Sequence, residues 1–295
     1  MNGKLRRSPA TGKSGPAQDL PPGLYVTATP IGNAADITLR ALKVLGSCDL
    51  IAAEDTRVTA KLLAIHGIVK PLTTYNDHNA GRERPKLLAK LRQGARIALV
   101  SDAGTPLISD PGFKLVREAV AEGLAVHAIP GTSAVLTGLA LAGLPTDRFL
   151  FAGFLPSKQG ERRSALEELK NIRATLVFFE SAQRLDASLA DMTAVFGVRT
   201  AAVARELTKL HEEVRRGLLS ELCAHYEKHG APKGEVTLII SPPHEVEADT
   251  GRIDSALDKA LAFMPTRAAV DLVAEMLEAP RRTVYERALG KKNDG

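Results

Sequence analysis

The residues with the clearest capacity for ligand chemistry lie between positions 101 and 112, in the segment SDAGTPLISDPG. The apolar run 97–100 before this segment is predicted to form a buried strand, because turn residues bound it and it is too short for a helix. In an open α/β sheet, ligands bind beyond the carboxyl ends of the strands. Asp102 is therefore expected at the ligand-binding edge of a sheet, and Gly104 allows the backbone to approach a ligand closely.

The side chains of this segment predict the kind of ligand. A phosphate-binding loop offers backbone amides at a helix amino end with no carboxylate in the way, whereas this segment carries Asp102 and Asp110 and no lysine. Carboxylates suit a ligand that has an ammonium group, a sulfonium or ribose hydroxyls. S-adenosylmethionine has all three. The alternative is a tight surface turn in which Asp and Gly serve turn geometry alone.

Strand and helix patterns alternate on both sides of this segment. Up to residue 130 the expected strands are 24–27, 50–53, 72–75, 97–100 and 125–129, and the expected helices are 37–45, 57–65, 83–92 and 113–122. Beyond the turn 130–133, we expect a helix at 134–142 and strands at 149–152, 175–179, 200–204 and 236–240. This order predicts two α/β domains, residues 23–130 with a mostly parallel sheet and residues 131–243, with a cofactor cleft between them.

Composition supports two folded domains in a reducing compartment. With 295 residues and 44% hydrophobic side chains, the chain can bury two cores of ordinary size. Its cysteines, Cys48 and Cys223, match no metal-binding spacing, and we expect no metal. No run approaches the ~20 apolar residues of a membrane span, and we expect a cytoplasmic protein. Residues 1–22 combine basic side chains with Gly, Pro and Ser, and we interpret them as a disordered basic arm.

Residues 252–290 are expected to form a small helical unit, with helices at 253–263, 267–277 and 281–289. The last helix carries Arg281, Arg282 and Arg287 within two turns. Two helices joined by a short turn, the second of them basic, give a weak helix-turn-helix signal. A plain three-helix cap on the second domain fits the pattern equally well.

Eight motifs occur in the order typical of one family. They are TPIGN at 29–33, AEDTR at 53–57, the segment 100–112, PGTSA at 130–134, AGLP at 142–145, FLP at 154–156, FES at 179–181 and ARELTK at 204–209. On these motifs the chain resembles, over roughly residues 23–290, the bacterial small-subunit ribosomal RNA cytidine 2′-O-methyltransferases of the tetrapyrrole methylase superfamily.

The resemblance implies a dimeric two-domain enzyme that holds S-adenosylmethionine in the interdomain cleft. The cofactor-binding residues that it implies are Pro30, Asp102, Gly104, Thr105, Thr132, Ser133, Ser181 and Ala204. The sequence departs from the family in one segment, because Asn76-Asp77-His78-Asn79-Ala80 stands where His-x-His-Asn-Glu is expected. A mechanism that needs the first His or the Glu is therefore in doubt, while His78 and Asn79 are available.

Methyl transfer to a ribose hydroxyl makes limited demands on the protein. The methyl group of a sulfonium is already activated, so the enzyme must mainly align the ribose 2′-oxygen and relieve it of its proton. Our candidates for a base or a helping cation are His78, Glu54 and Lys209, and Arg57 is the candidate for a substrate phosphate.

These polar residues also have structural interpretations. Asp55 could cap a helix amino end, and His78 could be an ordinary loop histidine. Lys209 could belong to a solvated charge cluster with Arg205 and Glu206, since surface ion pairs are common and weak. If a helix began there, Arg205 and Lys209 would share a face suited to phosphate, because they are four positions apart.

The sequence thus predicts S-adenosylmethionine-dependent 2′-O-ribose methylation of a cytidine in small-subunit ribosomal RNA by a homodimer. One alternative is C-methylation of a tetrapyrrole, a cobalamin or sirohaem precursor, in the same cleft. Another is a non-catalytic nucleic-acid-binding regulator whose terminal helices bind nucleic acid while the α/β body senses a small ligand. The ordered motifs, the basic arm and the arginines of the last helix favour the first function over the tetrapyrrole reaction.

Overall fold

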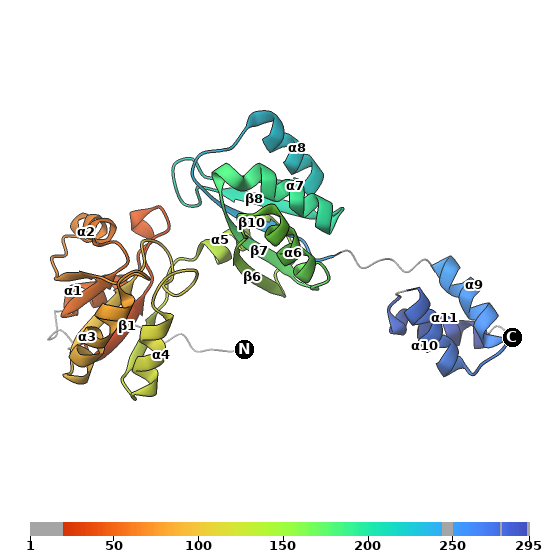
Figure 1. The fold of residues 1–295 in the computed structure, drawn as a ribbon, viewed down its shortest axis with the longest axis horizontal. Coiled ribbons are helices and arrows are strands. Elements are labelled where there is room, and N and C mark those ends of the chain that lie inside the picture. The colour runs from red at the N-terminus through yellow and green to blue at the C-terminus, as the bar shows by residue number, and fades with distance from the viewer. Residues whose placement is uncertain (1–19, 244–249, 278, 294–295) are drawn as a thin grey trace, which may run out of the picture.

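A computed structural model describes residues 20–243, 250–277 and 279–293, so most of the predicted basic arm lies outside the described residues. Figure 1 shows two α/β domains in chain order, followed by a group of three helices. Each domain contains one five-stranded sheet, and this architecture confirms the predicted fold class.

The first sheet is entirely parallel and has the strand order β3-β2-β4-β1-β5. Its strands are β1 (Gly23–Thr27), β2 (Leu50–Ala53), β3 (Leu72–Thr74), β4 (Arg96–Val100) and β5 (Val126–Ile129). Between them run η1 (Ala34–Asp36), α1 (Leu39–Ser47), α2 (Thr56–Ile65), α3 (Ala80–Arg92) and α4 (Phe113–Ala121). Because all five strands run in one direction, their carboxyl ends meet at one edge of the sheet.

Local signals fix the helices of this domain. The side chains of Thr38 and Asp55 accept hydrogen bonds from the amides of Ala41 and Arg57, which caps α1 and α2 at their amino ends. Most strand residues between the helices are apolar, and four residues of β4 are at most 2% exposed. This burial on both faces is typical of a parallel sheet covered by helices.

The second sheet is mixed, with the strand order β6-β7-β10-β8-β9. Its strands are β6 (Phe149–Phe154), β7 (Thr175–Ser181), β8 (Thr200–Arg205), β9 (Glu213–Leu218) and β10 (Glu235–Ile240). Only β6 and β7 are parallel, and the other neighbours are antiparallel. Its helices are α5 (Ala134–Ala142), α6 (Gln159–Leu169), η2 (Ala182–Arg184), α7 (Leu185–Phe196) and α8 (Leu219–His229). The sequence pattern missed β9, α6, α7 and α8.

The domain limits follow the two sheets. All strands of the first sheet precede residue 130, and α5 makes its contacts with β7, β8, β9 and β10 of the second sheet. We propose the limits 23–130 and 131–243 on this basis. No helix among the described residues is long and apolar enough to cross a membrane.

The last three helices have a hydrophobic core of their own. They are α9 (Thr250–Leu261), α10 (Thr266–Met276) and α11 (Arg281–Asn293). The core contains Ile253, Leu257, Val270, Val273 and Val284. Because these side chains bury one another, the helices form a small helical unit, as the sequence predicted. We propose residues 252–290 as its limits.

Candidate active site

A cleft of about 740 Å³ opens where the two α/β domains meet, within the size range of small-molecule sites. The first domain contributes the loop after β4 and the residue after β2, and the second contributes the ends of β6 and β7 and the start of β10. The predicted cofactor residues that line it are Asp102, Gly104, Thr105, Ser133 and Ser181. Pro30, Thr132 and Ala204 are not among the lining residues.

Gly104 is held at the cleft by a two-way backbone contact. Its N–H donates to the carbonyl of Thr29 at 3.0 Å, and the N–H of Thr29 donates to the carbonyl of Gly104 at 2.9 Å. Its φ of +75° favours glycine. The hydroxyl of Thr105 donates to the carbonyl of Thr132 at 3.0 Å, and that of Thr132 to the carbonyl of Thr29. Thr132 therefore takes part in the contacts that shape the loop, and Pro30 follows Thr29, which also takes part in them.

The loop after β4 stores backbone strain. Leu107 and Ser109 have φ values of 77° and 64°, in the left-handed region that side chains disfavour. Non-glycine residues in this region cluster at functional sites, where the surrounding structure holds them. Ser109 lines the cleft, so the strained segment forms part of its wall.

Glu54 and Asp102 are locked together at the ends of neighbouring strands. The carboxylate of Glu54 accepts from the N–H of Asp102 at 3.3 Å, and that of Asp102 accepts from the N–H of Asp55 at 3.0 Å. Burial raises the pKa of Glu54, and the charges of Asp102, Asp77 and Asp55 raise it further. Burial also raises the pKa of Asp102. The pair thus places two carboxylates with raised pKa values in the lining of the site.

A second, more polar pocket of about 520 Å³ adjoins the cleft. Glu54 and Asp102 line both pockets, and they therefore lie at the boundary between them. Arg57 and His78 line the second pocket only. The side chain of Arg57 is 86% exposed and pairs with Asp55 at 2.6 Å, so Asp55 caps α2, as the structural interpretation held, while it also orients Arg57.

Asp110, on the wall of the cleft, carries the largest upward shift at the site. Its pKa is raised to about 6, mainly by burial and also by the charges of Glu54 and Asp102, while a hydrogen bond from Ser101 opposes these effects. The ordinary pKa of Asp, which applies to the unfolded chain, is near 3.8, so ionisation of Asp110 destabilises the folded state relative to the unfolded state. Stability is therefore lost as the pH rises from the ordinary value to about 6.

We expect Asp110→Asn to raise the melting temperature of the ligand-free protein at about pH 8, by an amount equivalent to about 1 kcal/mol after allowance for solvent screening. Asparagine keeps the hydrogen-bonding shape and has no charge to bury. The gain should shrink as the pH falls through about 6 and vanish near pH 4. Thermal unfolding across this range tests the expectation, and a gain that is independent of pH would contradict it.

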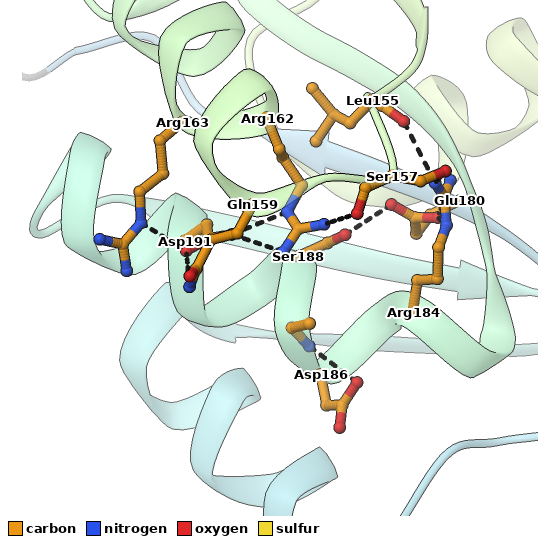
Figure 2. A network of polar contacts seen from close by, with 11 residues as sticks. Leu155, Ser157, Gln159, Arg162, Arg163, Glu180, Arg184, Asp186, Ser188 and Asp191 are labelled. Carbon is orange, nitrogen blue, oxygen red and sulfur yellow. Dashed lines mark hydrogen bonds and ion pairs between the residues drawn. The ribbon is translucent and has the colours of Figure 1, made fainter.

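A polar network braces the second-domain wall (Figure 2). The buried carboxylate of Glu180, which lines the cleft, accepts from the N–H of Ser181 at 2.7 Å and from the hydroxyl of Ser188 at 2.6 Å, and it pairs with Arg184. Arg184 also donates to the carbonyl of Leu155 at 3.3 Å. The network therefore ties the end of β6 to the end of β7, where Ser181 meets the cleft.

Two regions of the chain match known families. Residues 23–223 match the family described as Tetrapyrrole (Corrin/Porphyrin) Methylases. The chain belongs to this family. Residues 247–292 match the RsmI C-terminal HTH domain, which agrees with the helix-turn-helix signal of the sequence.

Two curated relatives share about half of their aligned residues with this tetrapyrrole methylase. It is 49% identical to the ribosomal RNA small subunit methyltransferase I of Mesorhizobium japonicum, over 94% of this chain and 95% of that protein. It is 50% identical to the protein of the same name from Erythrobacter litoralis, over 94% and 98%. Among solved structures, uroporphyrin-III C-methyltransferase from Thermus thermophilus, complexed with S-adenyl homocysteine, shares the fold with a TM-score of 0.53 and 18% identity, over 74% of this chain and 97% of that one.

The remaining predicted residues of the tetrapyrrole methylase lie elsewhere. Ala204 is fully buried in the core between α5 and the second sheet. Lys209 lines neither pocket, and its Nζ pairs with Glu206 at 2.7 Å and Glu235 at 2.9 Å. The conditional expectation of a helix from Arg205 is wrong, because β8 ends there and a turn follows in which Glu206 has a φ of 50°.

Sequence reasoning missed much of the second-domain wall. The structure adds Phe154, Phe179, Glu180, Gly234 and Glu235 to the cleft. The first three lie in motifs that carry the family resemblance, so a signal for them was present in the sequence. Gly234 and Glu235 stand at the entry to β10, which pairs with β7 only in the folded sheet. No local pattern of residues indicates that contact.

Proposed function

We propose that this protein transfers a methyl group from S-adenosylmethionine to the ribose 2′-oxygen of a cytidine in small-subunit ribosomal RNA. Its membership of the tetrapyrrole methylase family and its relatives named ribosomal RNA small subunit methyltransferase I support the reaction class and the RNA substrate. The observation that carries the assignment of the site is the pair Glu54 and Asp102, which borders both pockets.

The cleft suits S-adenosylmethionine chemically. Asp102 and Asp110 offer acceptors for the hydrogen bonds of an ammonium group or ribose hydroxyls, and their negative charge suits a sulfonium. Ile31, Phe154 and Phe179 provide apolar surface of the kind that covers an adenine ring. A ligand can lie against the backbone at Gly104, where a side chain would occupy the same space. These residues would hold the cofactor, which supplies an activated methyl group when bound.

The second pocket suits the target nucleotide. Glu54, at the boundary of the two pockets, can accept the proton of a 2′-hydroxyl that points from the second pocket toward the cleft, and a raised pKa makes it a better base than an ordinary glutamate. His78 lines the same pocket, where its ring can donate a hydrogen bond to the nucleotide. Arg57 is exposed enough to reach a backbone phosphate, although it must then share its guanidinium with Asp55.

The direct test is methyl transfer from labelled S-adenosylmethionine to small ribosomal subunits and, separately, to their free RNA. We expect label in RNA, and mass spectrometry should place it on the 2′-oxygen of one cytidine. A porphyrinoid is tested in a parallel assay, and label that appears only there would support the tetrapyrrole reaction instead. Absence of label from both the RNA and the porphyrinoid, with RNA binding retained, would support the non-catalytic regulator.

The terminal helices are the proposed RNA-binding unit. Their match to an HTH domain supports this role, although the three arginines of the last helix are paired with carboxylates in the structure. Arg281 pairs with Asp271 at 2.6 Å, Arg282 pairs with Glu286 at 2.8 Å, and Arg287 pairs with Asp254. Such exposed pairs are weak, so a phosphate can displace the carboxylates at little cost.

Replacing Arg281, Arg282 and Arg287 together by glutamine should weaken RNA binding and leave cofactor affinity unchanged. Each lost phosphate contact should flatten the salt dependence by about 0.7 in the log–log slope for single strands. Binding titrations at several salt concentrations measure the slope, with circular dichroism as the check on folding. An unchanged affinity and slope would place RNA recognition elsewhere.

Three further proposals concern the oligomeric state of the enzyme, its compartment and the form of its RNA substrate. We propose that the enzyme acts as a homodimer, that it acts in the cytoplasm, and that the assembled small subunit is its substrate. Sedimentation of the purified protein tests the first, and comparison of subunits with free RNA in the methylation assay tests the third.

A further inference from the structure

The turn 206–212 between β8 and β9 reaches from the second domain onto the first. The N–H of Asn33 donates to the hydroxyl of Thr208 at 3.1 Å. Leu207 packs in the same hydrophobic cluster as Ile31, and both line the cleft. This turn therefore forms a contact between the domains beside the cofactor cleft, in addition to the chain connection at 130–133.

Lys209 holds this turn through two carboxylates. Its Nζ bonds to Glu206 at 2.7 Å and to Glu235 at 2.9 Å, and its side chain is 29% exposed. The same oxygen of Glu206 accepts from the N–H of Glu235 at 3.0 Å. The ion pairs thus join the turn to the start of β10, which lines the cleft at Gly234 and Glu235.

Two glycines leave room for these side chains. A Cβ atom on Gly32, in the first domain, would lie closer to Cγ of Lys209 than van der Waals contact allows. A Cβ atom on Gly234 would overlap the carboxylate of Glu206 in the same way, and Gly234 has a φ of +99°. The stem of Lys209 is therefore packed against the backbone of the opposite domain.

The backbone of the turn is strained, and specific bonds retain it. Glu206 and Thr208 have φ values of 50° and 64°, which are unfavourable for residues with side chains. The N–H of Glu206 donates to the carbonyl of Glu235 at 3.0 Å, and the N–H of Thr208 donates to the carboxylate of Glu212 at 2.6 Å. A conformation of this cost persists only when its surroundings hold it.

We infer that Lys209 is a positioning residue whose contacts with Glu206, Glu235 and Gly32 form an interdomain latch that sets the width of the cofactor cleft. Lys209 is unsuited to catalysis because its ammonium group is matched by two carboxylates and lines neither pocket. The latch acts on the cofactor through the wall formed by Leu207, Gly234 and Glu235. This inference rests on the proposed binding of S-adenosylmethionine in the cleft.

Lys209→Met tests the latch, because methionine keeps an unbranched stem and removes the charge. We expect the Kd for S-adenosylhomocysteine, measured by calorimetry, to rise about tenfold or more as the cleft loses its preorganised width. At saturating S-adenosylmethionine, kcat should stay within about threefold of the wild type, because Lys209 does not touch the reacting atoms. Lys209→Arg should recover part of the affinity.

Gly32→Ala gives an independent test, because it disturbs the same contact from the opposite domain while leaving both carboxylate partners in place. It should raise the same Kd. The matched control is Lys158→Met, which removes an exposed lysine that pairs with Glu161 at 3.0 Å and lines neither pocket. This control should bind S-adenosylhomocysteine like the wild type.

Hydrogen exchange of the Asn33 and Thr208 amides in the ligand-free protein completes the test, and it does not depend on the proposed function. Both amides should exchange faster in Lys209→Met than in Lys158→Met. A wild type that fails to bind S-adenosylhomocysteine would contradict the proposed function, while exchange would still report on the latch. Unchanged exchange and Kd in Lys209→Met, or a hundredfold loss of kcat with unchanged Kd, would overturn the latch.

Discussion

Glu54→Gln is expected to lower kcat for RNA methylation by about 10²–10⁴-fold, the usual contribution of a general base. Glutamine has nearly the same shape and can still accept the hydrogen bond from the N–H of Asp102, so the strand ends should stay in place. What it cannot do is take a proton from the 2′-hydroxyl. The affinity for S-adenosylhomocysteine should therefore remain within about threefold of the wild type, because the loss concerns the reacting state alone.

The pH dependence of RNA methylation gives a second test of Glu54 as the base. Burial raises the pKa of Glu54, so the wild-type enzyme should lose activity as the pH falls through that raised pKa and the base becomes protonated. Glu54→Gln should lack this acidic limb. Asp77→Asn is the matched control, because Asp77 lines the second pocket with Glu54 but does not border the cleft. Equal losses in both variants would mean that Glu54 acts only through the charge of the pocket.

The first domain was largely predictable because its signals are local. Apolar runs of four or five residues mark its strands, and glycines and capping residues mark its helices. A parallel sheet then brings all the strand ends together. Glu54 and Asp102 meet for this reason although they are 48 positions apart. The boundary errors are small, as in α3, which begins at Ala80 and runs through Pro85 where a start near residue 83 was expected.

The second domain was less predictable because its contacts are non-local. Its sheet is mixed, so the alternation of strand and helix does not give the order of its strands. The four-residue spacing of Arg205 and Lys209 suggested a helical face, yet their partners are Glu213, Glu206 and Glu235. Spacing along the chain carries no information about carboxylates that are brought in by β9 and β10.

The ion pairs of the terminal arginines could not be predicted from the sequence for a similar reason. A sequence shows that Arg287 lies in a basic helix, but it does not show that Asp254 of α9 faces it from 33 positions away. Three arginines that look like a cationic surface in sequence are therefore ion pairs in the fold. Their capacity to bind RNA depends on how readily phosphates displace those carboxylates, which the salt dependence measures.

Gly104→Val should abolish detectable binding of S-adenosylhomocysteine while leaving the domain folded. The first atoms that a Cβ at this position would meet are Cγ2 of Ile31 at 3.4 Å and the carbonyl oxygen of Thr132 at 3.9 Å. Both contacts are tolerable, so the protein itself can accommodate the Cβ. The rest of a valine side chain must enter the cleft that Gly104 lines, where the ligand would otherwise approach the backbone.

The backbone cost of this substitution needs a control, because a branched residue at a φ of +75° is strained by about 1–2 kcal/mol wherever it occurs. Gly123 provides that control, since it has a φ of +71°, lies just after α4 and has no atom near its missing Cβ. Gly123→Val should lower the melting temperature by a similar amount and bind S-adenosylhomocysteine like the wild type. Calorimetry then separates strain from occupancy of the cleft. Retained binding in Gly104→Val would mean that the loop after β4 is only a turn and that the cofactor lies elsewhere.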